Sequence, residues 1–130
     1  MKAQQLRIGN IFKEKYTGDI LMVSELTKDR ITFDYQTENK WQVEPILLTE
    51  EILLKCGIVK DIDNGTIWID LQTHYLEFLI MPDGFYPTYT QCSEIRSEFE
   101  QRVSLNKISH LHQLQNLYHA LTGHELEVSI

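Results

Sequence analysis

Apolar residues that recur at every second position dominate the first 46 residues of this chain. The clearest alternating positions are Ile31, Phe33, Tyr35, Trp41 and Val43. Such alternation gives a strand one buried face and one wet face. Polar turn segments separate four short strands of this kind, and Pro45 ends the last one. Residues 1–46 therefore predict a small curled β module that resembles an SH3-like barrel.

A short capped helix is predicted at residues 49–56. Thr49 can accept a hydrogen bond from a free amide of the first turn, and Glu50 and Glu51 place negative charge at the positive end of the helix dipole. Gly57 supplies the left-handed residue that ends the helix. Cys56 falls on the inward stripe, where a thiol acts as a small apolar group.

Hairpins are predicted over residues 58–91, because Asn64-Gly65 and the Pro82–Gly84 segment are turn signals between apolar runs. Pro87 is expected to cut the last of these strands short or to confine it to a sheet edge. Residues 88–97 are then expected to form a loop.

The C-terminal part is predicted to contain a strand at about 98–105, a helix at about 107–121 and a final strand at 124–130. The helix carries a stripe at helical spacing, which Gly123 is placed to end. Leu126, Val128 and Ile130 alternate, and this predicts a strand paired into a sheet. The order of elements indicates an α+β fold with mostly antiparallel sheets and two helices.

This order of elements divides the chain into two segments: the β module of residues 1–46 and an α+β segment of residues 47–130. About 46 residues bury too little surface for comfortable stability alone. We therefore expect the two segments to pack as one unit.

Charge argues against binding to a nucleic-acid duplex. The 130 residues carry a net charge of −7. The first 46 residues are balanced, with seven basic and seven acidic side chains, so the remainder carries the whole excess. Duplex binding requires clustered Lys and Arg. The N-terminal residues lack the apolar stretch of a secretory signal, and no apolar run is long enough to cross a bilayer, so we expect a cytoplasmic protein with no membrane partner.

The familiar patterns of catalysis and metal binding are missing from the sequence. His112 and His119 are too far apart on a helix to hold one ion, and neither a His-Glu-x-x-His nor a Cys-x-x-Cys pattern occurs. Cys92 has acidic neighbours, which disfavour a reactive thiolate. Glycine-rich nucleotide loops are absent as well. We therefore predict no catalytic residues, no cofactor and no metal site.

Aromatic residues near the predicted turns indicate a candidate surface for binding a partner. The candidates for an interaction surface are Trp68, Phe85, Tyr86 and Tyr89. Trp and Tyr are enriched at protein interfaces because they bury large areas at low entropic cost. The competing interpretation is that these side chains simply cover the core of a small sheet.

The last predicted helix has a polar but uncharged side, which contains Gln113, Gln115, Asn116 and His119. Such amides can read bases, but this helix has no basic flank. We therefore expect them to bond to neighbouring backbone or to adjoining loops.

Three blocks of the chain form a recognisable combination: Arg7–Asn10, Pro45–Gly57 and His112–Leu126. Together they resemble a family of small uncharacterised proteins of Bacteroides-type gut bacteria and of their phages and mobile elements. The family typically has an aromatic residue after the glycine that ends the first helix, where this chain has Ile58. The resemblance implies a bacterial or phage setting and a cytoplasmic location, and it supplies no catalytic residues.

These observations favour a non-enzymatic interaction or adaptor protein that binds a protein partner or self-associates. The rival interpretation is nucleic-acid engagement, either directly by the first β module or through acidic mimicry of DNA. A third interpretation is an enzyme whose site is assembled from scattered residues. A deep pocket lined by several of four residues would support it: Asp70, His74, Glu77 and Arg96. The sequence identifies no small-molecule ligand.

Overall fold

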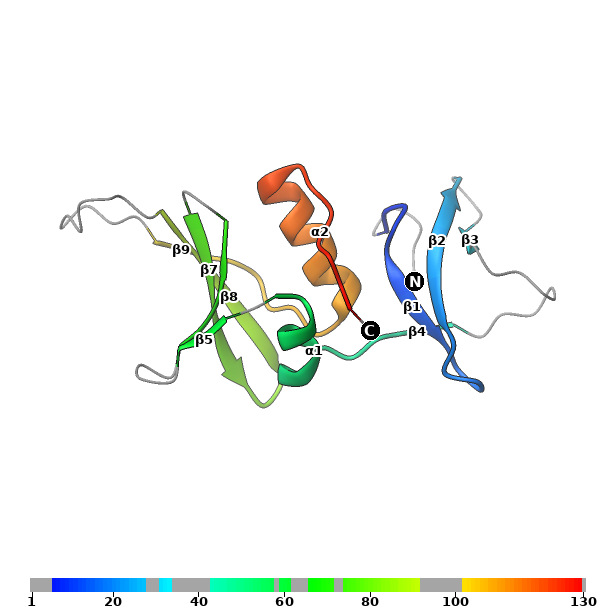
Figure 1. Ribbon diagram of the computed structural model, residues 1–130, viewed down its shortest axis with the longest axis horizontal. Coiled ribbons are helices and arrows are strands. Elements are labelled where there is room, and N and C mark those ends of the chain that lie inside the picture. Colours follow the sequence, from blue (N-terminus) through cyan, green and yellow to red (C-terminus); the bar gives the residue numbers. More distant parts are fainter. Residues whose placement is uncertain are drawn as a thin grey trace. The chain divides into compact units, whose positions relative to one another are not determined.

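The protein has an α+β fold with two helices and mostly antiparallel sheets, as predicted (Figure 1). The computed structural model describes residues 6–27, 31–33, 43–57, 59–61, 66–71, 74–91 and 102–129. The chain divides into two compact units. Unit 1 combines residues 1–47 with 110–126, and unit 2 combines residues 48–109 with 127–130.

The sheet of unit 1 is a small curled module of the SH3-like kind that the alternating pattern predicted. Its strands are β1 (Ile11–Glu14), β2 (Ile20–Leu26), β3 (Ile31–Phe33) and β4 (Val43–Pro45). They pair antiparallel in the order β3-β2-β1-β4, with an irregularity in β2 between Val23 and Glu25. Tyr35 and Trp41, two of the alternating aromatics, lie outside the described residues.

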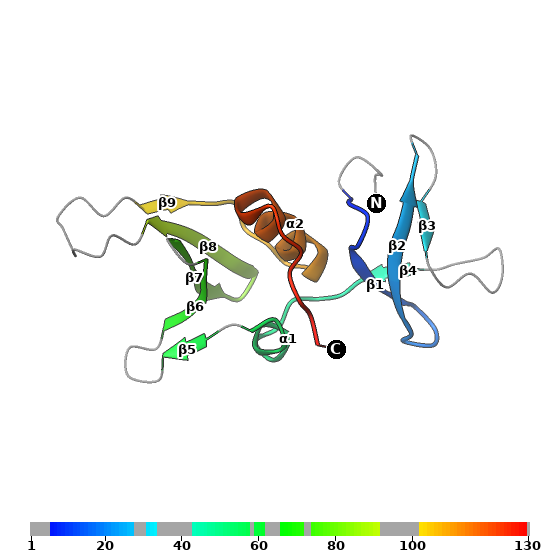
Figure 2. The ribbon, with the colours of Figure 1, turned by 45° about the horizontal axis from the view of Figure 1, so that its top comes forward.

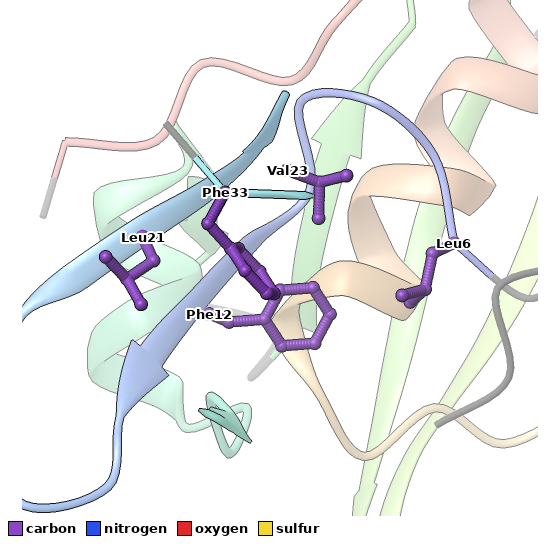
Figure 3. Packing of buried hydrophobic residues seen from close by; sticks show 5 residues of the cluster. All are labelled: Leu6, Phe12, Leu21, Val23 and Phe33. Carbon is purple, nitrogen blue, oxygen red and sulfur yellow. The ribbon is translucent and has the colours of Figure 1, made fainter. Parts of the chain in front are cut away.

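A compact apolar cluster fills the concave side of this sheet. Figure 3 shows its members, which are Leu6, Phe12, Leu21, Val23 and Phe33. The Phe12 and Phe33 rings meet edge to face, with centroids 6.0 Å apart. Phe12 and Val23 have no exposed surface, so they form the centre of this core. Burial of this aromatic and aliphatic surface is the main stabilising term for unit 1.

Helix α1 (Glu50–Lys55) in unit 2 confirms the predicted capped helix. The Thr49 hydroxyl accepts a hydrogen bond from the Ile52 amide at 3.2 Å. Gly57 has a φ of 76°, the left-handed geometry expected just beyond the C-cap residue Cys56. Leu53 is fully buried.

Unit 2 also contains a five-stranded antiparallel sheet. Its strands are β5 (Val59–Asp61), β6 (Thr66–Asp70), β7 (His74–Met81), β8 (Gly84–Gln91) and β9 (Arg102–Ser104). Figure 2 shows them side by side in sequence order. Of the predicted strand at 98–105, residues 98–101 lie outside the described part of the chain. The same holds for the Asn64-Gly65 turn.

Strand β8 continues through Pro87, so the expectation of an edge or a short strand there was wrong. It runs between β7 and β9, with Phe78 opposite Pro87 and Thr88 opposite Ser104. The Pro87 carbonyl accepts a hydrogen bond from the amide of Leu105, the residue just after β9, at 2.9 Å. The nitrogen and the carbonyl of a residue in an antiparallel strand point to the same side, so the Pro87 nitrogen also faces the chain beyond the end of β9. A missing N–H costs little there. The loop predicted for residues 88–97 is therefore strand up to Gln91, and residues 92–97 lie outside the described part.

Helix α2 (Leu111–Thr122) begins four residues later than predicted and belongs to unit 1. Ile108 is extended because it exchanges two 2.9 Å backbone hydrogen bonds with Phe85. The helix then starts after His110, whose amide donates to the Gln113 side chain at 3.0 Å. Gly123 ends the helix with a φ of 74°, as predicted. The last helix therefore completes unit 1, in contrast to the predicted division, which grouped it with residues 47–130.

The strand predicted at residues 124–130 is not present in its described part, residues 124–129. Leu126 is buried between exposed Glu125 and Glu127, so the alternation of burial is present. Among the described residues, one hydrogen bond joins the backbone of this segment to other backbone: the Ser129 amide donates to the Lys55 carbonyl at 3.1 Å. The segment thus does not join a sheet, and Figure 1 draws it as a red trace without an arrow after α2.

Candidate functional site

The four aromatic residues predicted as an interaction surface do not come together on one face. Cross-strand partners share a face of a sheet, and Trp68, Glu77 and Thr88 are partners, so Trp68 and Tyr86 lie on one face of the unit 2 sheet. Phe85 and Tyr89 lie on the opposite face with the buried residues Ile69 and Leu76. Phe85 is only 7% exposed and therefore belongs to the core.

On its own face, Trp68 packs against another aromatic ring. The Trp68 and Tyr75 rings meet edge to face with centroids 6.3 Å apart, from adjacent strands. Both side chains are half-buried. Their contact stabilises the β6–β7 pairing and still leaves part of both rings accessible.

Among the described residues, exposed apolar side chains are concentrated instead at the end of the β7–β8 hairpin. Leu79, Ile80 and Met81 are consecutive and have exposed fractions of 62%, 47% and 43%. Leu79 lies opposite Tyr86 in the register, and Ile80 lies opposite Phe85 on the other face. Exposed apolar side chains therefore lie on both faces of the sheet here, Leu79 on one and Ile80 on the other. We call Leu79, Ile80, Met81 and Tyr86 the hairpin-end surface.

Sequence reasoning missed Leu79, Ile80 and Met81 because it considered only the aromatic residues near the predicted turns. Leu76 and Phe78, earlier on β7, are buried, whereas Ile80 is exposed. The available signal was the break in alternation: three apolar residues in a row directly precede the Pro82–Gly84 turn. By contrast, the exposed Ile20 and Met22 on β2 keep the alternation with buried Leu21 and Val23.

The turn beside the hairpin-end surface carries an ordered polar group. The Tyr86 hydroxyl donates to the Asp83 carboxylate at 2.8 Å, and the Lys107 ammonium lies 3.7 Å from the same oxygen. The hydrogen bond from Tyr86 is the main reason that the pKa of Asp83 lies below its ordinary value. It also raises the pKa of Tyr86, so this phenol stays protonated near neutrality. These contacts fix the Tyr86 ring against the turn.

The polar side of α2 bonds to the turn before β1, as expected for inter-element packing. Gln115 accepts from the Ile11 amide at 2.8 Å and donates to the Gly9 carbonyl at 3.2 Å. Asn116 accepts from Asn10 at 2.8 Å and from Arg7 at 3.2 Å. The first and third recognisable sequence blocks thus hold each other in place.

Ion pairing also neutralises most of the positive charge that the structure describes in unit 1. The basic residues of that described part are Arg7, Lys13 and Lys15. Arg7 pairs with Glu125, and Lys13 lies 3.8 Å from Glu44. A phosphate backbone would have to compete with these carboxylates for Arg7 and Lys13.

Across the described ranges, no group of three or more His, Cys, Asp or Glu residues is placed to hold a metal ion. Cys56 is buried, and burial raises the pKa of its thiol to about 11. Cys92 lies outside the described part. Two buried polar atoms have no hydrogen-bond partner among the described residues: the Thr90 hydroxyl oxygen and Nδ1 of His112.

The described residues give little support to the interpretation as an enzyme with a dispersed active site. Glu77 is half-buried opposite Trp68 on the β6–β7 pair. The side chains of Asp70, His74 and Arg96 lie outside the described part of the structure. Neither of the two described helices has the length and apolarity that a bilayer span requires.

Comparison of the chain with models of protein families, with curated proteins and with solved structures gives no match.

Proposed function

We propose that this chain is a non-enzymatic binding protein that acts by contacting a protein partner through the hairpin-end surface. The observation that carries the proposal is the run Leu79–Met81, which exposes three consecutive large apolar side chains. Single exposed apolar residues are normal on soluble proteins, but a contiguous group marks a surface that gains free energy from being covered.

The geometry of the surface suits a protein partner. The Tyr86 ring is held by Asp83, so little side-chain entropy is lost when a partner packs against it. Leu79 and Ile80 project from opposite faces of the hairpin. A partner that contacts both faces of the hairpin end would bury more apolar area than one that contacts a single face.

The resemblance to proteins of Bacteroides-type gut bacteria and their phages suggests where to look for the partner. We place the chain in the cytoplasm of such a cell, whether it is encoded by the host or by a mobile element. A second copy of the chain is the alternative partner on the same surface.

Site-specific photo-crosslinking in a bacterial host of this type tests the proposal. A benzophenone amino acid at position 79 or 81 is compared with the same group at position 54, since Leu54 on α1 is also 51% exposed. We expect one protein to crosslink from positions 79 and 81 but not from position 54. Equal crosslinking from all three positions, or none, would contradict the proposal.

A binding measurement with purified proteins completes the test. The double variant Leu79→Ser/Met81→Ser should weaken binding of the crosslinked protein roughly tenfold or more, because anchor residues at an interface dominate its affinity. The control Leu54→Ser should leave the affinity unchanged. Light scattering on the same samples shows whether the crosslinked species is a second copy of the chain.

A further inference from the structure

His112, in the first turn of α2, is packed as if it were an apolar aromatic residue. Its side chain is 8% exposed, and its ring lies 4.9 Å from the ring of Phe12 at a tilt of 30°. Phe12 has no exposed surface and lies at the centre of the unit 1 core. Nδ1 of His112 is buried and has no hydrogen-bond partner among the described residues.

A protonated imidazole does not fit this environment. The cation carries an N–H on both nitrogens, so it requires an acceptor at Nδ1, where the described residues provide none. Burial also removes water from the charge. The position in the first helical turn adds the positive end of the helix dipole.

The charged groups around His112 do not compensate. The His110 ring is stacked at 5.9 Å, and its protonation would add a second positive charge. On β1, Lys13 pairs with Glu44, while Glu14 accepts from the amides of Tyr16 and Thr17 in the following turn. Consistent with this arrangement, burial first and His110 second lower the pKa of His112 to about 4.

We propose that the stacking of His112 on Phe12 is an acid-sensitive latch that holds α2 against β1 and opens when the imidazole takes up a proton. Among the described residues, α2 also binds the N-terminal turn through the side-chain hydrogen bonds of Gln115 and Asn116, which do not titrate. Arg7 of the same turn pairs with Glu125, which lies beyond the end of α2. His112 is therefore the titrating contact of the helix itself, and the variant His112→Phe separates its effect from that of the ion pair. This device is independent of the proposed hairpin-end function.

The direction and size of the effect follow from proton linkage. Because the folded-state pKa of His112 lies below the value of 6.5 of an accessible imidazole, the stabilisation is complete above pH 6.5 and falls as the pH drops toward 4. Between pH 7.5 and pH 5.0, the equilibrium for opening α2 should rise roughly thirtyfold.

Amide hydrogen exchange on the full chain measures this equilibrium, once intrinsic rates are corrected for pH. The protection of α2 amides should fall roughly thirtyfold between pH 7.5 and 5.0 in the wild type, while the amides of β7 serve as the internal reference. His112→Phe keeps a ring on Phe12 but cannot titrate, so its protection should be unchanged. The matched control His119→Phe removes another histidine of the same helix and should behave like the wild type.

Two results would overturn the proposal: an unchanged α2 protection in the wild type, or the same fall in His112→Phe. NMR titration of the wild-type His112 resonances provides a second measurement that needs no variant. A resonance that does not titrate above pH 5 supports the latch. A resonance that titrates between pH 6 and 7 in the folded protein refutes it.

Discussion

The side-chain amide of Asn10 donates a 2.8 Å hydrogen bond to the side-chain oxygen of Asn116, which lies 106 positions further along the chain. Asn10 is fully buried, and its own side-chain oxygen accepts from the Arg7 amide at 2.7 Å. The turn before β1 and helix α2 therefore supply hydrogen-bond partners to each other's buried polar groups. This relationship explains why α2 belongs to unit 1 although unit 2 separates the two in sequence.

Gln115 should be the most costly polar residue of α2 to remove. It is 2% exposed, and Gln115→Ala would leave the Ile11 amide and the Gly9 carbonyl without their partner. We expect the free energy of unfolding, measured in urea, to fall by about 2–3 kcal/mol. The control Gln113→Ala removes a bond at the helix N-terminus and should cost about 1 kcal/mol. Equal losses in the two variants would show that the Gln115 bonds carry no special weight.

Gly84 should tolerate a side chain less well than Gly18, although both have positive φ. A Cβ at Gly84 would lie 3.0 Å from the Ile108 carbonyl oxygen, whereas nothing lies within 4 Å of a Cβ at Gly18. That carbonyl accepts from Phe85 and cannot move freely. Gly18→Ala should cost about 1–2 kcal/mol from backbone strain. Gly84→Ala should cost at least about 1 kcal/mol more. Urea unfolding of both variants tests the ranking, and a larger loss in Gly18→Ala would contradict it.

Cys56 should be inert toward alkylating reagents in the folded protein. Its thiol is buried, and its pKa of about 11 lies above the ordinary value of 9.0, so the thiolate fraction at pH 8 is reduced roughly a hundredfold. In a Cys92→Ser background, iodoacetamide labelling followed by mass spectrometry should be slow in buffer and fast in urea. Rapid labelling in buffer would show that the Cys56 site opens frequently.

A shortened chain should fold if α2 completes unit 1. The segments entering and leaving unit 2 run antiparallel: Leu48 donates to Ser109, and Leu111 donates to Ile46. Replacement of residues 49–108 by Asn-Gly places a two-residue hairpin turn between Leu48 and Ser109. Circular dichroism and NMR should show a cooperatively folded protein.

The matched control for this chain is residues 1–48 alone, which lack α2. This fragment loses the contacts of Phe12 with His112 and of Ile11 with Gln115, and it is too short for a stable core. It should therefore be unfolded. If both chains behave alike, α2 is not an essential part of unit 1.

Local chemistry made several elements predictable. Thr49 and Gly57 fixed the ends of α1, because capping depends on residues within a few positions of each other. The turn signal of the Pro82–Gly84 segment marked where β7 ends. The aromatic candidates were less well placed, since residue type alone does not reveal that Phe85 faces inward and Tyr86 outward at the same hairpin.

Signals along the chain determined where most strands of this protein form and where both helices end, because these choices depend on side chains close in sequence. Only the tertiary structure decided that Ile108 pairs with Phe85 instead of starting a helix, and that residues 124–129 form no strand. It also decided that α2 completes unit 1 and that Leu79–Met81 remain uncovered. These outcomes depend on backbone partners and apolar cover supplied by residues distant in sequence, and no local pattern encodes which partner arrives.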